Sequence, residues 1–173
     1  MSVRLWLLPV FLLVAVDQLS KYWVETALPL YQRVDLLPFL SLFRTYNEGI
    51  AFSFLSDLGA VPLIILTILI IFFVLWLWRG LEEGRWISAL GYSLIIAGAL
   101  GNLIDRIRLG KVIDMIFFHI DYLRFEFAVF NLADTFITLG ALAIITDEYL
   151  NWRAGREEKT DRKTNPENDT GKT

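Results

Sequence analysis

The sequence predicts a membrane protein that is mainly helical, with four transmembrane helices and a small extracytoplasmic β-sheet. Hydrophobic residues make up 55% of the 173 residues, a share too high for a water-soluble domain of this size. Uncharged stretches long enough to cross a bilayer recur along the chain. Between them lie mixed stretches that contain turn residues and favour short strands outside the lipid.

Composition excludes several classes of function. The net charge of -3 does not suggest nucleic-acid binding. The chain contains no cysteine, which excludes disulfides, thiolate zinc sites and thiol nucleophiles. The single histidine, His119, excludes a multi-histidine metal site, and we expect it at the membrane interface rather than in catalysis. No serine with a histidine partner occurs in a plausible setting, so a nucleophilic triad is not expected. We expect neither a cofactor nor a bound metal.

The first expected helix spans residues 5–28. Its beginning alone is typical of a cleavable signal peptide, but no small-x-small cleavage pattern follows. Asp17 would lie ~18 Å along this helix, inside a hydrocarbon layer ~30 Å thick. Asp17 and Lys21 are four residues apart and are expected to pair on one face. The pair either supports a functional site or only neutralises itself between helices.

Residues 29–57 predict an extracytoplasmic β element. Two short strands are expected around the turn Asn47-Glu48-Gly49, the second of them at residues 50–55. Gly49 can adopt a positive φ, and Asn47 can offer its amide to a ligand. An asparagine at a turn is equally compatible with a purely structural role.

The second and third expected spans cover residues 60–78 and 86–104. The charged connector at 79–85 is short, so the two spans are antiparallel neighbours. A small, polar face near the far end of the third span permits close helix packing, and its residues are Gly98, Gly101 and Asn102.

Polar residues follow this third span. Asn102, Asp105 and Arg106 stand at i, i+3 and i+4, so all three point the same way. The alternative is a simple ion pair between Asp105 and Arg106 at the helix end. The next segment, 108–126, is mixed, and one carboxylate, Asp114, interrupts its apolar run.

The fourth expected span covers residues 128–150 and carries Asn131 and Asp134 near its start. An ionised side chain at bilayer depth costs at least ~2.5 kcal/mol, so Asp134 is a candidate functional residue. The alternative is that Asp134 lies in the headgroup layer. Asn131 and Asp134 are three residues apart and share a helix face. Residues 154–173 are polar and predict a disordered cytoplasmic tail after a membrane domain of residues 1–153.

With four spans, both termini lie on one side of the membrane, which we take as the cytoplasm although the positive-inside signal is weak. The polar residues then gather at similar depth near the outer face. Two carboxylates in a low-dielectric pocket share one proton, which suits water activation and peptide hydrolysis. Two alternatives remain at this point: a transporter or proton relay through the membrane carboxylates, and a divalent-metal enzyme that uses Asp and Asn oxygens.

Five short motifs occur in order along the chain: Asp17-Gln18-x-Ser20-Lys21, Asn47-x-Gly49-x-Ala51-Phe52, Gly101-Asn102-x-x-Asp105-Arg106, Val112-x-Asp114 and Phe130-Asn131-x-Ala133-Asp134. In this order between four spans, they resemble the lipoprotein signal peptidases (signal peptidase II). The resemblance covers all but the tail. It implies an aspartic endopeptidase of the bacterial inner membrane that removes signal peptides from diacylglyceryl-modified prolipoproteins, cutting on the N-terminal side of the lipidated cysteine.

The resemblance also implies roles for individual residues. Asp114 and Asp134 correspond to the catalytic dyad. The residues that bind substrate or support the dyad would be Asp17, Lys21, Asn47, Gly49, Asn102, Asp105, Arg106, Asn131 and Ala133. Glu48 and Ile50 fill the open positions of the second motif and have no assigned role.

The same resemblance implies where the site lies and what meets it. The segments 29–57 and 105–127 would be extracytoplasmic, with the active site near the outer face. Strands before residue 55 would cradle the substrate, and the stretch around Phe117 and Phe118 would cover it. Membrane lipids and globomycin-type inhibitors are implied partners, and we expect a monomer.

Overall fold

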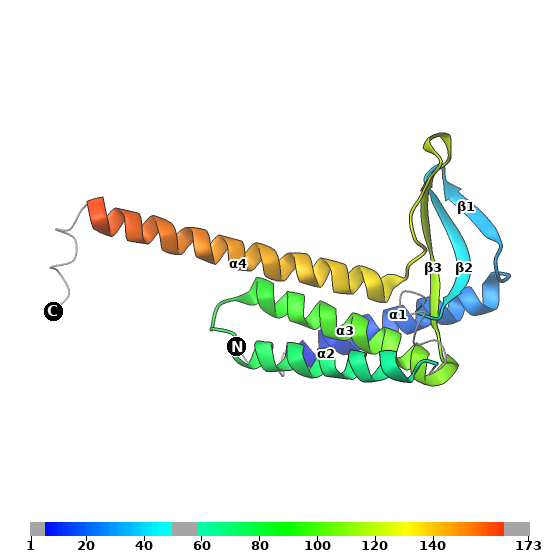
Figure 1. Cartoon of the computed structure of the whole chain (residues 1–173), viewed down its shortest axis with the longest axis horizontal. Coiled ribbons are helices and arrows are strands. Elements are labelled where there is room, and N and C mark those ends of the chain that lie inside the picture. Colours follow the sequence, from blue (N-terminus) through cyan, green and yellow to red (C-terminus); the bar gives the residue numbers. More distant parts are fainter. Residues whose placement is uncertain (1–5, 50–58, 165–173) are drawn as a thin grey trace.

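The computed structural model describes residues 6–49 and 59–164, with side chains described up to residue 157. The elements in chain order are α1 (Leu7–Ala27), β1 (Arg33–Leu37), β2 (Leu40–Asn47), α2 (Val61–Arg79), α3 (Trp86–Leu109), β3 (Val112–Ile120), a 3-10 turn (Asp121–Leu123), β4 (Phe125–Glu126) and α4 (Leu132–Thr164). Figure 1 shows the four long helices side by side, with the sheet across one end of the bundle. At the other end, α4 extends past its neighbours.

The central helix is α3, which packs against α1, α2 and α4. Where α3 meets α4, Gly91 opposes Gly140, and a Cβ added at Gly91 would lie 2.7 Å from the Gly140 carbonyl oxygen. A Cβ at Gly98 would likewise collide with the Ala133 carbonyl oxygen. Small residues allow such close helix packing where lipid provides no hydrophobic driving force. The close packing expected from the small face of the third span is therefore present.

Three of the described helices are long and apolar enough to cross a membrane: α1, α2 and α3. The mean hydropathy of their most apolar windows is 1.4, 2.9 and 1.7. Only 17% of the α1 window and 11% of the α2 window are buried inside the protein, as expected of helices that face lipid. We conclude that this is a membrane protein. The first 18 residues of α4 carry Asp134, Asp147 and Glu148. Because of these charges, α4 is less apolar than the three candidate membrane helices.

The sheet has four antiparallel strands in the order β1-β2-β3-β4. Thr45 on β2 is opposite Asp114 on β3, whereas Ser41 on β2 is opposite Phe117. The register shifts between Leu42 and Thr45, so an irregularity in β2 separates its two ends. Each end of β3 thus faces a different part of β2, and each carries its own polar cluster.

The predicted helices agree with the structure at their cores and differ at their ends. The expected spans 5–28 and 60–78 correspond to α1 and α2. The third span was expected to end at residue 104, but α3 continues to Leu109, because Asp105 turns inward to a buried partner instead of entering water. The fourth helix begins at Leu132, four residues later than expected, because Asn131 caps it.

The strand prediction is correct for one strand. Residues 40–47 form β2, but its partners are β1 and β3. The hairpin turn joining β1 and β2 lies at residues 38–39, not at Asn47-Glu48-Gly49. The second expected strand, at residues 50–55, lies outside the described residues. The prediction overlooked that β3, far along the chain, supplies the pairing edge.

The tail also differs from expectation. Residues 154–164 continue α4 as a helix, whereas the sequence analysis assigned residues 154–173 to a disordered tail. Arg153 and Glu157, four residues apart, form an ion pair at 2.9 Å, and pairs at this spacing stabilise helices. Residues 165–173 lie outside the described part of the chain.

Candidate active site

Two acidic residues from different elements meet where the sheet joins the helices. Asp114 is the third residue of β3, and Asp134 lies in the first turn of α4. Gly110 ends α3 with φ +72°, and its N–H donates to the Arg106 carbonyl. A residue with a side chain is strained in that conformation, so glycine suits this turn. The tight turn returns the chain alongside α3 and brings Asp114 back to it.

Asp134 is held by the cap of its own helix. The Asp134 N–H donates to Asn131 Oδ1 at 3.0 Å, and the Asn131 N–H donates to Asp134 Oδ2 at 3.2 Å. This reciprocal pair is a capping box built from Asn and Asp. It explains why α4 begins at Leu132, and it fixes the orientation of the Asp134 carboxylate at the helix end.

Three asparagine amides connect the two acids. Asn131 Nδ2 donates to Asp114 Oδ1 at 2.7 Å, so Asn131 contacts both carboxylates. Asn47 Nδ2 donates to Asp114 Oδ2 at 3.0 Å, and Asn102 Nδ2 donates to Asp134 Oδ1 at 2.8 Å. Every oxygen of the pair therefore accepts a hydrogen bond, and each keeps a second lone pair for a water or a substrate.

The electrostatics distinguish Asp114 from an ordinary carboxyl group. Asp114 is 2% exposed. Burial, and then the negative charge of Asp134, raise the pKa of Asp114 to about 6. The hydrogen bonds from Asn47 and Asn131 act in the opposite direction because they stabilise the ionised form. At a pH between the ordinary value of 3.8 and about 6, Asp114 therefore retains a proton that an exposed aspartate would lose.

A buried ion cluster lies behind the pair. Lys21 Nζ lies 2.9 Å from Asp17 Oδ2 and 2.9 Å from Asp105 Oδ2, and it donates to Asn102 Oδ1 at 3.0 Å. The expected Asp17–Lys21 pair is therefore present. Asp105 pairs with Lys21 and not with Arg106, which overturns the alternative of a simple helix-end pair. Asp17 Oδ1 accepts a hydrogen bond from the Ala133 N–H at 3.0 Å, so α1 and α4 meet beside this cluster.

The remaining expected residues, Gly49 and Arg106, are partly buried near the acidic pair. Gly49 has φ +78°, and its N–H donates to Asn47 Oδ1 at 2.9 Å. Glu48 beside it is exposed, whereas Ile50 lies outside the described residues. Arg106 is partly buried in the electrostatic field of Asp134, Asp105 and Asp114. The structure thus gathers all eleven of the expected site residues around one point.

Comparison with known proteins decides the family. A family model described as signal peptidase (SPase) II matches residues 9–150. The chain belongs to the signal peptidase II family. It is therefore a peptidase. A lipoprotein signal peptidase of Bartonella henselae is 52% identical over 151 residues, which is 87% of this chain and 92% of the relative. One of Mesorhizobium japonicum is 50% identical over 140 residues, covering 81% of this chain and 82% of the relative.

Two solved structures of bacterial membrane enzymes share the fold of this chain. Two structures, described as bacterial membrane enzymes studied by the in meso method at 1.9 Å and 2.3 Å resolution, superpose with TM-scores of 0.70 and 0.73. Both are 30% identical in sequence. They cover 83% and 86% of this chain, and 91% and 89% of their own lengths.

This signal peptidase II chain also holds a second polar cluster, which the sequence analysis missed. Ser41 Oγ lies 2.7 Å from His119 Nε2, and His119 Nδ1 lies 2.9 Å from Asp121 Oδ1. Ser41 therefore has a histidine partner that could not be read from the sequence. Ser41 and His119 are 0% and 1% exposed, so both side chains are buried within the protein. Ser41 and His119 lie 78 positions apart in sequence, and no local pattern joins them.

The geometry of this second cluster does not suit nucleophilic catalysis. Ser41 donates its hydroxyl proton to Asp35 Oδ1 at 2.6 Å, so that proton is not directed at His119. In addition, the Arg33 side chain contacts His119, and Arg33 Nε donates to Ser41 Oγ at 3.1 Å. A buried hydroxyl enclosed in this way has no access to a substrate. The cluster joins β1, β2 and the end of β3.

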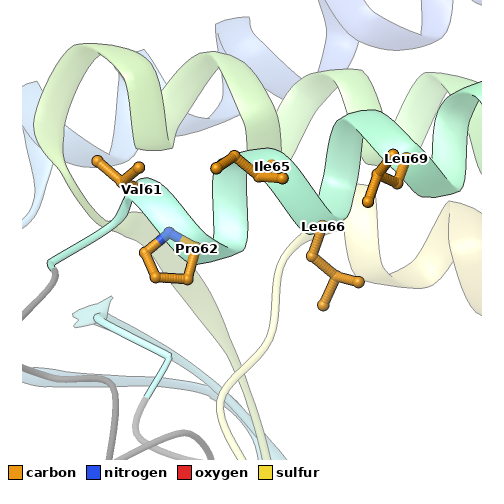
Figure 2. A pocket seen from close by; sticks show the side chains of 5 residues that line it. All are labelled: Val61, Pro62, Ile65, Leu66 and Leu69. Atoms are coloured by element: carbon orange, nitrogen blue, oxygen red, sulfur yellow. The ribbon is translucent and has the colours of Figure 1, made fainter.

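An apolar groove lies along the first half of α2. Figure 2 shows its lining side chains with the ribbon of α3 behind the helix, and they are Val61, Pro62, Ile65, Leu66 and Leu69. The same end of α2 contacts the turn after β2, because a Cβ added at Gly49 would collide with the Leu63 side chain. Since Asn47 binds Asp114, the groove begins near the acidic pair. Among the described residues, no cluster of three or more His, Cys, Asp or Glu side chains is arranged to hold a metal ion.

Proposed function

We propose that this chain is a lipoprotein signal peptidase that cleaves diacylglyceryl-modified prolipoproteins on the N-terminal side of the lipidated cysteine, using water activated by Asp114 and Asp134. The relatives named as lipoprotein signal peptidases support the substrate class. The observation that carries the mechanism is that Asn131 binds both carboxylates, through its side chain to Asp114 and its backbone to Asp134. Two acids so joined suit a water molecule held between them.

The two acids take different roles. Asp114 holds the shared proton, because burial and the Asp134 charge raise its pKa to about 6. Ionised Asp134 takes a proton from water as the water attacks the scissile carbonyl, while Asp114 donates its proton to the carbonyl oxygen. In the resulting tetrahedral diol, the proton on Asp134 passes to the leaving nitrogen, and Asp114 recovers a proton from the diol. The peptide bond breaks, and the pair returns to its initial state.

The supporting residues hold this arrangement. Asn47, Asn102 and Asn131 orient the carboxylates through their amides. The cluster of Asp17, Lys21 and Asp105 lies behind them and Ala133 connects it to α4, whereas Gly49 and Arg106 face the substrate. No metal or organic cofactor takes part in this mechanism.

The placement in the membrane follows from the same arrangement. In the proposal, α4 is a fourth span beside α1, α2 and α3, so that both termini lie in the cytoplasm of the bacterial inner membrane. The sheet and the acidic pair lie near the outer face, and residues beyond 153 form a cytoplasmic extension. A diacylglyceryl substrate reaches such a site from the outer leaflet. The protein works as a monomer among membrane lipids.

The substrate surface combines the groove on α2 with the sheet. Val61, Ile65 and Leu69 offer apolar contacts to the membrane part of the substrate. Phe118 shares a sheet face with Asp114, because alternate residues of a strand point to the same side. Phe117 points to the opposite face and contacts His119 at a ring separation of 5.2 Å. The cover expected from Phe117 and Phe118 therefore falls to Phe118.

The decisive experiment replaces each acid by its near-isosteric amide. Asp114→Asn and Asp134→Asn should each reduce cleavage of a diacylated precursor by at least about 100-fold, because one proton-transfer group is lost. Thermal unfolding in detergent checks that both variants remain folded. Full activity of both variants contradicts the proposed mechanism. Wild-type cleavage should persist in EDTA and stop with globomycin, whereas loss in EDTA would favour a metal enzyme.

A further inference from the structure

Two carboxylates behind the acidic pair, those of Asp17 and Asp105, each bind the backbone next to one acid of the pair. Asp17 Oδ1 accepts from the N–H of Ala133, the residue before Asp134. Asp105 Oδ2 accepts from the N–H of Ile113, the residue before Asp114, at 3.2 Å. The distance between Asp17 and Asp105 therefore influences the distance between the two acids of the proposed dyad.

One lysine is shared by these two carboxylates. Lys21 lies 2.9 Å from an oxygen of each, so a single positive charge serves two negative charges in a buried setting. A buried charge without enough compensation is costly, and hydrogen bonds to the remaining lone pairs reduce that cost. The position therefore calls for a further donor that adds no charge.

Gln18 supplies that donor. Its Nε2 donates to Asp105 Oδ1 at 3.0 Å and lies 3.2 Å from Asp17 Oδ2. The same nitrogen lies 3.1 Å from the Gly101 carbonyl oxygen on α3. The site leaves little room at this level, because a Cβ added at Gly101 would collide with the Asp17 carboxylate. The amide thus joins α1 to α3 where the two carboxylates converge, without adding a charge.

We propose that Gln18 is a positioning residue of this peptidase, whose neutral amide sets the separation of Asp17 and Asp105 and, through them, the separation of Asp114 and Asp134. The proposal rests on the proposed function, because it concerns the geometry of that dyad. Gln18 contacts neither Asp114 nor Asp134. In the proposal it affects turnover through the geometry of these two acids and does not contribute to substrate binding.

Gln18→Glu is the test, because it exchanges a neutral donor for a titratable group of the same shape. The kcat and KM of the full-length variant in detergent are compared with those of wild type at about pH 5 and about pH 8. These two values bracket the range in which we expect the introduced carboxyl group to lose its proton. At the higher pH we expect kcat to be about tenfold below wild type, because a third negative charge pushes the carboxylates apart. At the lower pH the protonated Glu donates, and the deficit shrinks. The KM should stay within about twofold.

Gln18→Leu and Ser20→Ala complete the experiment. The leucine variant removes the donor without adding charge, so its kcat deficit should be the same at both pH values. Ser20 lies on the same helix and donates only to the Asp17 backbone carbonyl, at 2.7 Å, so Ser20→Ala should match wild type. The proposal is overturned if the ratio of the Gln18→Glu kcat to the wild-type kcat does not change with pH, or if Gln18→Leu has the wild-type kcat. Activity of Asp114→Asn and Asp134→Asn would instead overturn the proposed function.

Discussion

The two ends of β3 carry polar clusters of opposite character. At its start, Asp114 is buried and surrounded by asparagine amides. Near its end, buried His119 belongs to a cluster whose acids reach solvent: the side chains of Asp35, which binds Ser41, and Asp121, which binds His119, are 62% and 64% exposed. The two clusters share a strand, but only the first joins a buried acid, Asp114, to a second acid through one asparagine.

The pKa of aspartate shows what this difference does. Burial and a like charge raise the pKa of Asp114 to about 6. A hydrogen bond from Arg33 lowers the pKa of Asp121, and a hydrogen bond from Ser41 lowers that of Asp35. The Ser41–His119–Asp121 series has the residue types of a hydrolytic triad, yet its solvated charges act as a structural brace. The exposure of the carboxylates and the direction in which the Ser41 hydroxyl proton points, rather than residue type, distinguish the two clusters.

Removing the cation from each cluster should reveal the largest difference in stability between the two clusters. Lys21→Met leaves Asp17 and Asp105 buried without their counter-charge, and we expect a loss of about 3–5 kcal/mol in unfolding free energy. Arg33→Met leaves carboxylates that water already solvates, and we expect little change. Thermal unfolding of both variants in the same detergent measures the difference. Equal losses would contradict the contrast between the clusters.

Removing the shared asparagine tests whether one residue aligns the acids. Asn131→Ala deletes the hydrogen bond from the side-chain amide to Asp114 and the acceptor for the Asp134 N–H. We expect cleavage to fall by about 100-fold, because misplaced groups lose near-attack geometry. Loss of the helix cap should cost about 1 kcal/mol in stability. Cleavage assays and chemical unfolding check the two effects separately, and wild-type turnover would show that the acids align without Asn131.

The pH dependence sharpens the comparison. The Asn47 hydrogen bond lowers the pKa of Asp114, so Asn47→Ala should raise it further. If Asp114 donates the proton, activity is lost as the pH rises through its pKa, and the alkaline limb of kcat/KM should move to higher pH in this variant. Ser41→Ala is the control and should leave the limb in place. A shift to lower pH would assign the proton donor to another group.

The smallest effect is expected at the serine of the second cluster. Ser41→Ala removes buried hydrogen bonds to Asp35 and His119, which should cost about 1 kcal/mol in stability. Cleavage should stay within about twofold of wild type, because Ser41 is not a nucleophile in the proposed mechanism. An activity loss as large as that of Asn131→Ala would place the second cluster in the catalytic path.

Much of the site was accessible from the sequence. The spacing of Asn131 and Asp134 predicted that both share a helix face, and the structure joins them in a capping box. The four-residue spacing of Asp17 and Lys21 predicted their pair. Both are local relations within one helix. By contrast, the contact of Lys21 with Asn102 spans 81 positions, and nothing in either segment specifies it.

The sheet shows the same limit. Residues 40–47 have the composition of a strand, but the partner of a strand depends on which segment approaches its edge in space. The structure pairs β2 with β3, and this pairing creates both the Asn47–Asp114 contact and the Ser41–His119 contact. The missed helical extension of α4 is a different case, since its ion pair at 153 and 157 was visible in the sequence.

The sequence by itself determined that this is a helical membrane protein, where most of its spans lie, and which acids and amides its motifs contain, because hydropathy and helical spacing are local properties. Only the tertiary structure decided which carboxylates share Lys21, which strands pair, and which aspartates of the two polar clusters are buried. Those outcomes depend on the approach of segments far apart in the chain. Burial and neighbouring charge, which set the reactivity of an aspartate, exist only after that approach.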